Sequence, residues 1–369
     1  MSKATETVLT LSMPALAHNY TFLKSKLQSN TKFLAVVKAV AYGSDALAIA
    51  QKLVHLGVDY FAVAYTDEGV ALRKGGITTP ILVLHPQPSS FETLIAYCLE
   101  PNIYSAHVLQ NFTAVAKEQQ QTHYPIHLKF NTGLNRLGFA PEKAKAVAET
   151  IEQENALRLV SVFSHLAASE DPNEVTFTKA QITQFKHICS TVETTIGRTV
   201  LKHLCNTSGL LNYPEAHFDM VRPGIGLYGY GNNSKIDQQL QAVGTLKTII
   251  SQLHTLAPGT SVGYNRAFIS EQNMVSATLP IGHADGIRRQ YGHRKGMVWV
   301  NGQKAEIIGN VCMDMLMIDV TDIPCKEGDE VIIFGGPYSA EAFATKGNTI
   351  SYELLTGIAH RVKRELSYT

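Results

Sequence analysis

The fold of this chain is indicated first by residues 35–43, AVVKAVAYG. The apolar, β-branched beginning of this stretch is typical of a buried parallel strand, and Lys38 and Tyr42 follow where that strand ends. A lysine at this position is a candidate to form a Schiff base with an aldehyde. The alternative is an ordinary surface lysine that closes a strand, so the rest of the chain has to decide between the two.

Strand-like and helix-like segments alternate on both sides of this stretch. A helix is predicted to open at residues 12–14, Ser-Met-Pro, and a second to span residues 45–56. A third is predicted over residues 66–74, with Thr66 as its N-cap. Eight strands separated by crossover segments predict a (β/α)8 barrel of the TIM type. The strands are expected near residues 33–37, 59–63, 81–84, 101–104, 126–130, 159–163, 200–204 and 219–222.

The pattern changes after about residue 235, where short alternating strands are separated by turn signals. The clearest signal is Asn301-Gly302, a dipeptide typical of a two-residue hairpin turn. We therefore expect a barrel domain at residues 1–235, followed by an all-β domain at residues 236–369.

The composition, with 45% hydrophobic and 17% charged residues among 369, is that of an ordinary globular protein. A formal net charge of +1, without a basic or acidic block, gives no reason to expect nucleic acid or a membrane as a partner. The first seven residues lack the apolar core of a signal peptide, so a cytoplasmic protein is expected. Five widely spaced cysteines without a Cys-x-x-Cys pair argue against a disulfide framework and against a metal site.

Polar residues follow the predicted strands where barrel enzymes carry their chemistry. An amine, hydroxyl groups and the backbone N–H groups of a glycine turn would then share one face, as an aldehyde cofactor with a phosphate requires. Pyridoxal phosphate fits this set, although each residue alone would carry little weight. The residues are Lys38, Tyr42, Lys129, Arg136, His165, Asn206, Thr207, Arg222, Gly224 and Ile225.

The order of several motifs resembles that of bacterial alanine racemases, which combine a barrel with a β-domain and use pyridoxal phosphate. The motifs are VKAVAYG at 37–43, GLNRLG at 133–138, RPGIGLYG at 222–229, ADG at 284–286 and VCMDM at 311–315. The resemblance implies that Lys38 holds the cofactor covalently and serves as the base on the D face of the substrate. It also implies that Tyr264 serves as the base on the L face and enters from the partner subunit of a homodimer.

The resemblance assigns further roles. Arg222 corresponds to the residue beside the pyridine nitrogen, Arg136 to the clamp on the substrate carboxylate, and Lys129 to a lysine that is often carbamylated. The backbone N–H of Met313 is implied to help Arg136 from the partner subunit. The remaining implied residues are Tyr42, His165, Asn206, Thr207, Gly224, Ile225 and Tyr352 for cofactor binding, and His203, Cys312 and Asp314 in supporting positions.

The function expected from this resemblance is the interconversion of L-alanine and D-alanine by two-base transfer of the α-proton, which supplies D-alanine for peptidoglycan. His283 and Asn310 depart from the pattern in the access channel, so a broad-specificity or serine-preferring racemase is the first alternative. A pyridoxal-phosphate-binding protein without turnover is a second alternative, against which the domain that bears Tyr264 argues. An amino-acid decarboxylase is a third, against which Arg222 argues.

Overall fold

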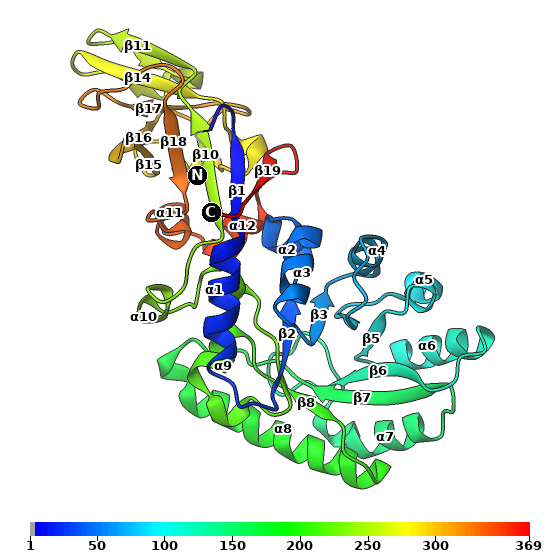
Figure 1. Cartoon of the computed structure of the whole chain (residues 1–369). Helices are drawn as coiled ribbons and strands as arrows, with labels where there is room; N and C mark the ends of the chain where they lie inside the picture. The colour runs from blue at the N-terminus through cyan, green and yellow to red at the C-terminus, as the bar shows by residue number, and fades with distance from the viewer. Residues whose placement is uncertain (1–3) are drawn as a thin grey trace.

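Eight parallel strands close into a barrel in the order β2 to β9, in a computed structural model that describes residues 4–369 (Figure 1). The barrel closes where Phe33 of the first of these strands pairs with Val221 of the last. This confirms the predicted TIM-type barrel. The strands are β2 (Lys32–Val36), β3 (Tyr60–Val63), β4 (Ile81–Val83), β5 (Glu100–Ile103), β6 (Tyr124–Lys129), β7 (Leu157–Phe163), β8 (Leu201–His203) and β9 (Met220–Val221).

Helices cover the outside of the barrel, and the first of them have the predicted starts. Ser12 Oγ accepts a hydrogen bond from the Ala15 N–H, and Asp45 Oδ1 accepts one from the Ala48 N–H. The helices of this part are α1 (Met13–Lys24), α2 (Lys38–Gly43), α3 (Ala46–His55), α4 (Thr66–Lys74), α5 (Phe91–Ala96), α6 (Ala106–Glu118), α7 (Ala144–Glu152), α8 (Val175–Ile196), α9 (Thr207–Asn212) and α10 (Ser234–Asp237).

The predicted N-cap of α4 was wrong by one residue. Tyr65 occupies the cap position, and Thr66 instead pairs its hydroxyl with Ser90 Oγ. The free N–H groups of Ala64 and Tyr65 are satisfied by the Glu68 carboxylate. An acidic side chain in the first turn therefore reaches back to the N-cap backbone, as in a capping box, while Tyr65 itself offers no side-chain cap.

The second domain is built on a sheet in the order β11-β14-β17-β16-β15-β18-β10-β1-β19. A separate pair, β12 (Ser261–Val262) and β13 (Phe268–Ile269), forms a small hairpin beside it. Two helices, α11 (Ala340–Lys346) and α12 (Ser351–Thr356), depart from the all-β expectation. The strands of the large sheet are β1 (Val8–Ser12), β10 (Gly244–Ile249), β11 (Gln252–Leu256), β14 (Met274–Leu279), β15 (Met297–Val300), β16 (Gln303–Ile308), β17 (Leu316–Asp319), β18 (Glu330–Phe334) and β19 (Lys363–Ser367).

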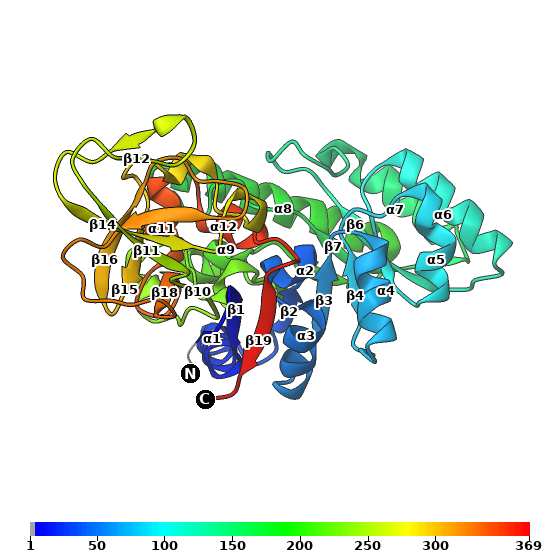
Figure 2. The same ribbon diagram turned by 90° about the horizontal axis from the view of Figure 1, so that it is seen from above.

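Strand β1 belongs to the sheet of the second domain although it precedes the barrel in sequence. It lies between β10 and β19, with Val8 opposite Lys247 on one side and Lys363 on the other. Both ribbon views show β1 and β19 side by side (Figures 1 and 2). The two domains are consequently joined twice, by α1 and by the segment after β9.

The predicted hairpin at Asn301-Gly302 is confirmed. It joins β15 to β16, and both turn residues have positive φ, 50° for Asn301 and 79° for Gly302. These angles fit the type I′ turn, whose twist matches that of the flanking strands.

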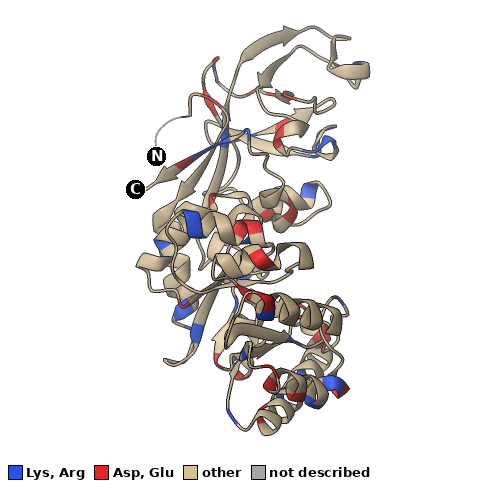
Figure 3. Ribbon diagram, turned by 90° about the vertical axis from the view of Figure 1, so that its right-hand side faces the viewer, with Lys and Arg blue, Asp and Glu red and all other residues tan. Residues whose placement is uncertain are grey.

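The surface carries charges of both signs. Figure 3 shows basic and acidic residues interspersed over both domains. Among the helices of residues 4–369, none has both the length and the hydropathy needed to cross a bilayer.

Candidate active site

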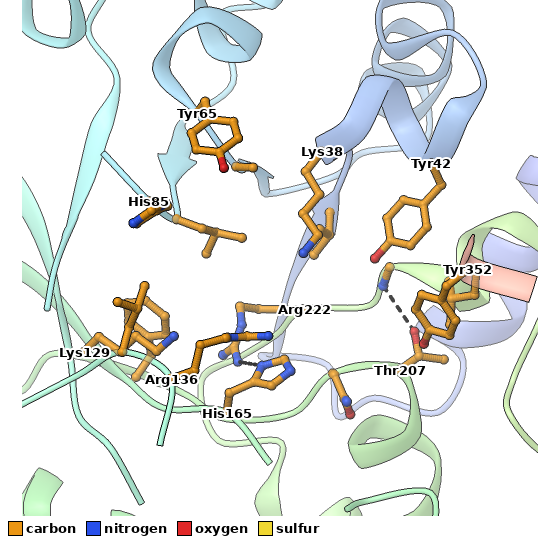
Figure 4. A pocket seen from close by; sticks show the side chains of 18 residues that line it. Lys38, Tyr42, Tyr65, His85, Lys129, Arg136, His165, Thr207, Arg222 and Tyr352 are labelled. Carbon is orange, nitrogen blue, oxygen red and sulfur yellow. Dashed lines mark hydrogen bonds between the residues drawn. The ribbon is translucent and has the colours of Figure 1, made fainter. Parts of the chain in front are cut away.

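A cavity of about 620 Å³ opens at the carboxyl-terminal end of the barrel strands (Figure 4). Its 18 lining residues, all in the described part of the chain, include no aspartate or glutamate, and four are cationic: Lys38, Lys129, Arg136 and Arg222. Cations that face one another in a partly buried space repel each other, so this cavity suits an anionic ligand. The other predicted residues that line it are Tyr42, His165, Asn206, Thr207, Gly224, Ile225 and Tyr352.

Lys38 and Tyr42 reach this cavity through a left-handed helical turn. Residues 39–42 have φ between 52° and 56°, a conformation that costs L-residues roughly 1–2 kcal/mol each. The Glu68 carboxylate accepts the N–H of Ala39 at 2.6 Å, and Arg364 donates to the Gly43 carbonyl at 2.9 Å. Contacts at both ends of the turn therefore hold a backbone that its own sequence disfavours.

The two lysines of the cavity have lowered pKa values. Burial, and then Arg136, lower the pKa of Lys38, while Glu68 opposes the shift. Burial and the nearby Arg222, Arg136 and Lys38 lower the pKa of Lys129 to about 7. Both amines therefore lose their protons more easily than an exposed lysine does, as a nucleophile or base requires.

Arg222 is buried, and four acceptors lie around its two terminal nitrogens. Its Nη1 donates to His203 Nδ1 at 2.9 Å, and its Nη2 contacts His165 Nδ1 at 3.1 Å. Nη2 also donates to the carbonyls of Ser164 and Leu204. Burial, and then Arg222, lower the pKa of both histidines, so each is neutral and can accept. Burial lowers the pKa of Arg222 itself to about 10, which leaves it a cation at neutral pH.

The opposite wall of the cavity is formed around Thr207. Its Oγ1 accepts hydrogen bonds from the N–H groups of Gly224 and Gly226, at 3.1 and 3.2 Å. A Cβ atom at Gly224 would lie 2.2 Å from the Tyr42 hydroxyl, so only glycine lets the chain approach that closely. The Tyr352 ring lies 6.0 Å from the Tyr42 ring and completes the wall. Hydroxyl and backbone N–H groups are thus concentrated on one side.

Tyr264 does not lie in this cavity. It follows β12 and lines a second cavity of about 660 Å³ on the second domain, together with Cys312, Met313 and Asp314. Tyr264 is 73% exposed and Met313 is 59% exposed. The Asn310 side chain donates to the Tyr264 carbonyl at 3.0 Å. Within one chain, the predicted residues therefore form two separate groups.

Two lining residues were not singled out in the sequence. Tyr65 follows β3 and His85 follows β4, and their rings lie 5.8 Å apart at the mouth of the cavity. Both stand just beyond the carboxyl ends of barrel strands, the position that identified the other residues. The signal was present, but a tyrosine and a histidine after short strands are too common to stand out.

Comparison with known proteins places these features in a family. The sequence model described as "Alanine racemase, N-terminal domain" matches residues 11–232, and "Alanine racemase, C-terminal domain" matches residues 243–366. An alanine racemase from Halothermothrix orenii is 35% identical, over 96% of this chain and 95% of the relative. An alanine racemase 2 from Oceanobacillus iheyensis is 36% identical, over 96% of this chain and 91% of the relative.

Solved structures agree with this match. An alanine racemase from Clostridium difficile 630 has a TM-score of 0.93 at 31% identity, over 100% of this chain and 97% of that chain. An alanine racemase from Bartonella henselae with covalently bound pyridoxal phosphate has a TM-score of 0.89 at 28% identity, over 99% of this chain and 100% of that chain. With both domains matched and relatives above 30% identity over nearly the full length, this chain belongs to the alanine racemase family of isomerases.

Proposed function

We propose that this protein interconverts L-alanine and D-alanine with pyridoxal phosphate attached to Lys38, and that its D-alanine serves peptidoglycan synthesis. The observation that carries the proposal is the barrel cavity, where a lysine of lowered pKa shares the space with three other cations and no acid. Such a site suits both a phosphate and the carboxylate of an amino acid. The covalent pyridoxal phosphate of the Bartonella henselae relative supports the choice of cofactor.

The donor set fits the cofactor group by group. The Lys38 amine would bind its aldehyde, and Arg222 would face its ring nitrogen. The hydroxyl groups of Thr207, Tyr42 and Tyr352, beside the glycine turn, would hold its phosphate; Asn206, His165 and Ile225 line the space between. When bound, the cofactor withdraws electrons from the α-carbon of the substrate and so acidifies the α-proton.

The chain itself must orient the substrate and move a proton. Arg136 would bind the substrate carboxylate, because a guanidinium matches its planar shape and charge. Lys129 lies among the same cations, and its neutral amine can add carbon dioxide to form a carbamate, with one amine proton released to water. That change would place a negative charge beside Arg136 and fix the guanidinium. Lys38, whose lowered pKa permits a neutral amine, would hold or release the α-proton on the D face.

The L face needs a second base, and we assign it to Tyr264 of the partner subunit. Within one chain Tyr264 lies away from Lys38, in an exposed cavity with Met313 and Met315, which are 59% and 50% exposed. An exposed apolar group of this kind is typical of an interaction surface. A twofold homodimer would place this surface of each subunit over the barrel cavity of the other, so that Tyr264, Met313 and Cys312 complete the site.

The test is a chiral assay of the purified protein. With added pyridoxal phosphate, L-alanine and D-alanine should each approach an equal mixture, and L-serine should react more slowly. Lys38→Ala should abolish the reaction, because it removes both the amine proposed to hold the cofactor and the proposed base on the D face. A serine rate above the alanine rate would instead favour a serine-preferring racemase, and bound cofactor without inversion of any amino acid would refute the assignment.

A further inference from the structure

Arg222 is a buried cation without a carboxylate beside it. The groups that accept its hydrogen bonds are two backbone carbonyls and two imidazole nitrogens. Among the residues that the structure describes, no carboxylate forms an ion pair with its guanidinium, although buried charges are normally paired. The orientation of Arg222 therefore depends on what holds the two imidazoles in place.

A line of hydrogen bonds crosses the barrel interior behind Arg222. The line begins at His203, which accepts a hydrogen bond from Arg222, and the His203 Nε2 atom lies 2.8 Å from Ser161 Oγ. Ser161 Oγ lies 2.6 Å from His127 Nδ1, and His127 Nε2 lies 2.6 Å from Glu100 Oε2. His127, Ser161 and His203 are completely buried, and the Glu100 side chain is 12% exposed. The line thus ends at a carboxylate, on the neighbouring strands β5, β6, β7 and β8.

The two ends of this line determine the direction of its outer hydrogen bonds. A guanidinium can only donate, so His203 accepts at Nδ1 and carries its proton on Nε2. Ser161 then accepts from His203, and its own hydroxyl hydrogen can point to His127 Nδ1. With the Ser161 hydrogen in that direction, His127 carries its one proton on Nε2 and donates it to the Glu100 carboxylate, which can only accept. Each member has one donor and one acceptor in use, and no buried hydrogen-bonding group in the line is left over.

We propose that Ser161, His127 and Glu100 are positioning residues, which form a one-way hydrogen-bond chain that fixes the His203 tautomer and so holds the imidazole nitrogen that accepts from Arg222. The inference rests on the proposed function only in giving Arg222 a place beside the cofactor ring. The His203 ring stacks on Phe163 at 4.7 Å and 5°, so its plane is set by packing while its tautomer is set by the chain. Tyr60 supports the far end, because burial and the Glu100 carboxylate raise its pKa and keep its hydroxyl a donor toward that carboxylate.

The chain can be tested by the protonation of its two histidines. Histidine nitrogens of the full-length protein, with pyridoxal phosphate bound and labelled with ¹⁵N, report each tautomer at neutral pH; His127→Gln and His203→Gln assign the signals. Both histidines should be protonated on Nε2 alone. A doubly protonated His127 would make Glu100–His127 a local ion pair, with Ser161 accepting from both rings, and would overturn the proposal.

Transmission along the chain needs a second set of variants. Glu100→Gln keeps an acceptor for His127 but removes the charge, and it should shift the nitrogen resonances of His203. Ser161→Ala breaks the chain. In a protein that already carries Ser161→Ala, adding Glu100→Gln should therefore cause no further shift of the His203 resonances. If Glu100→Gln moves His203 equally in both backgrounds, the effect is not transmitted through Ser161 and the proposal is wrong.

The kinetic consequence separates positioning from general stability. Losing one link of a buried network should lower kcat for L-alanine about tenfold in Ser161→Ala while KM stays unchanged, because the chain does not touch the substrate. Adding Glu100→Gln to Ser161→Ala should not lower kcat further.

Thr113→Val is the matched control, since it removes a buried hydroxyl that bonds only to its own helix, at the Leu109 carbonyl. An unchanged kcat in folded Ser161→Ala, or an equal fall in the control, would refute the positioning role. The tautomer measurement needs no turnover, so it stands whether or not alanine is the substrate.

Discussion

Two inactive variants of this chain should restore activity to each other when they share a dimer. Lys38 and Tyr264 line different cavities of one chain, so a site that uses both must take them from different subunits. In a heterodimer of Lys38→Ala with Tyr264→Phe, one site carries both substitutions and the other carries neither. The structure therefore predicts about half of the wild-type kcat per dimer, from two parents that are each inactive.

The assay uses co-expression of the two variants with different affinity tags, isolation of the doubly tagged dimer, and chiral chromatography of its product from L-alanine. The control pairs Lys38→Ala with Arg136→Ala, because both residues belong to the barrel cavity of the same chain. In that heterodimer each site carries one substitution, and no activity should return. Absence of recovery in the first pair, or equal recovery in both, would refute the assignment of Tyr264 to the partner's site.

Three further predictions concern single residues. The Lys129 pKa is lowered to about 7, against about 10.4 in an unfolded chain. The unfolded state therefore binds more protons between these values, and the stability of the cofactor-free protein should rise with pH through this window. Lys129→Met should flatten that rise in Tm; an unchanged slope would contradict the shift. Thr207→Val leaves the Gly224 and Gly226 N–H groups without their acceptor and should lower the free energy of unfolding by about 1–3 kcal/mol. The variant should also release pyridoxal phosphate faster than the wild type, as followed by absorbance. Wild-type stability and wild-type cofactor retention would both count against this role of Thr207. Val40→Gly, in the left-handed turn, should raise the free energy of unfolding in denaturant by about 1 kcal/mol. A lower free energy of unfolding would show that the turn is not strained.

The sequence was sufficient for features that depend on local patterns. The alternation of eight strand-like segments with crossover segments predicted the barrel, because parallel neighbouring strands need such connections. Asn301-Gly302 predicted its hairpin because few other dipeptides accept two positive φ angles. Residues after strands, such as Lys38 and Thr207, could be assigned to one cavity because the carboxyl ends of parallel strands meet there.

Features that depend on distant contacts could not be predicted. Residues 39–42 contain no glycine or asparagine that would signal a left-handed turn, which is imposed by Glu68 and Arg364 from other parts of the chain. The continuation from His203 through Ser161 and His127 to Glu100 was also hidden, because each of these residues comes from a different strand and none carries a recognisable motif.

The position of β1 between β10 and β19 also bears on the order in which this protein can fold during synthesis. Residues 8–12 leave the ribosome before the barrel, but their partners at 244–249 and 363–367 follow only after it. The barrel can close while translation continues, whereas β1 must wait as an unpaired strand. The large sheet is completed only when residues 363–367 have emerged. That sheet belongs to the domain that bears Tyr264, so the proposed dimer would assemble only after the synthesis of these last strand residues.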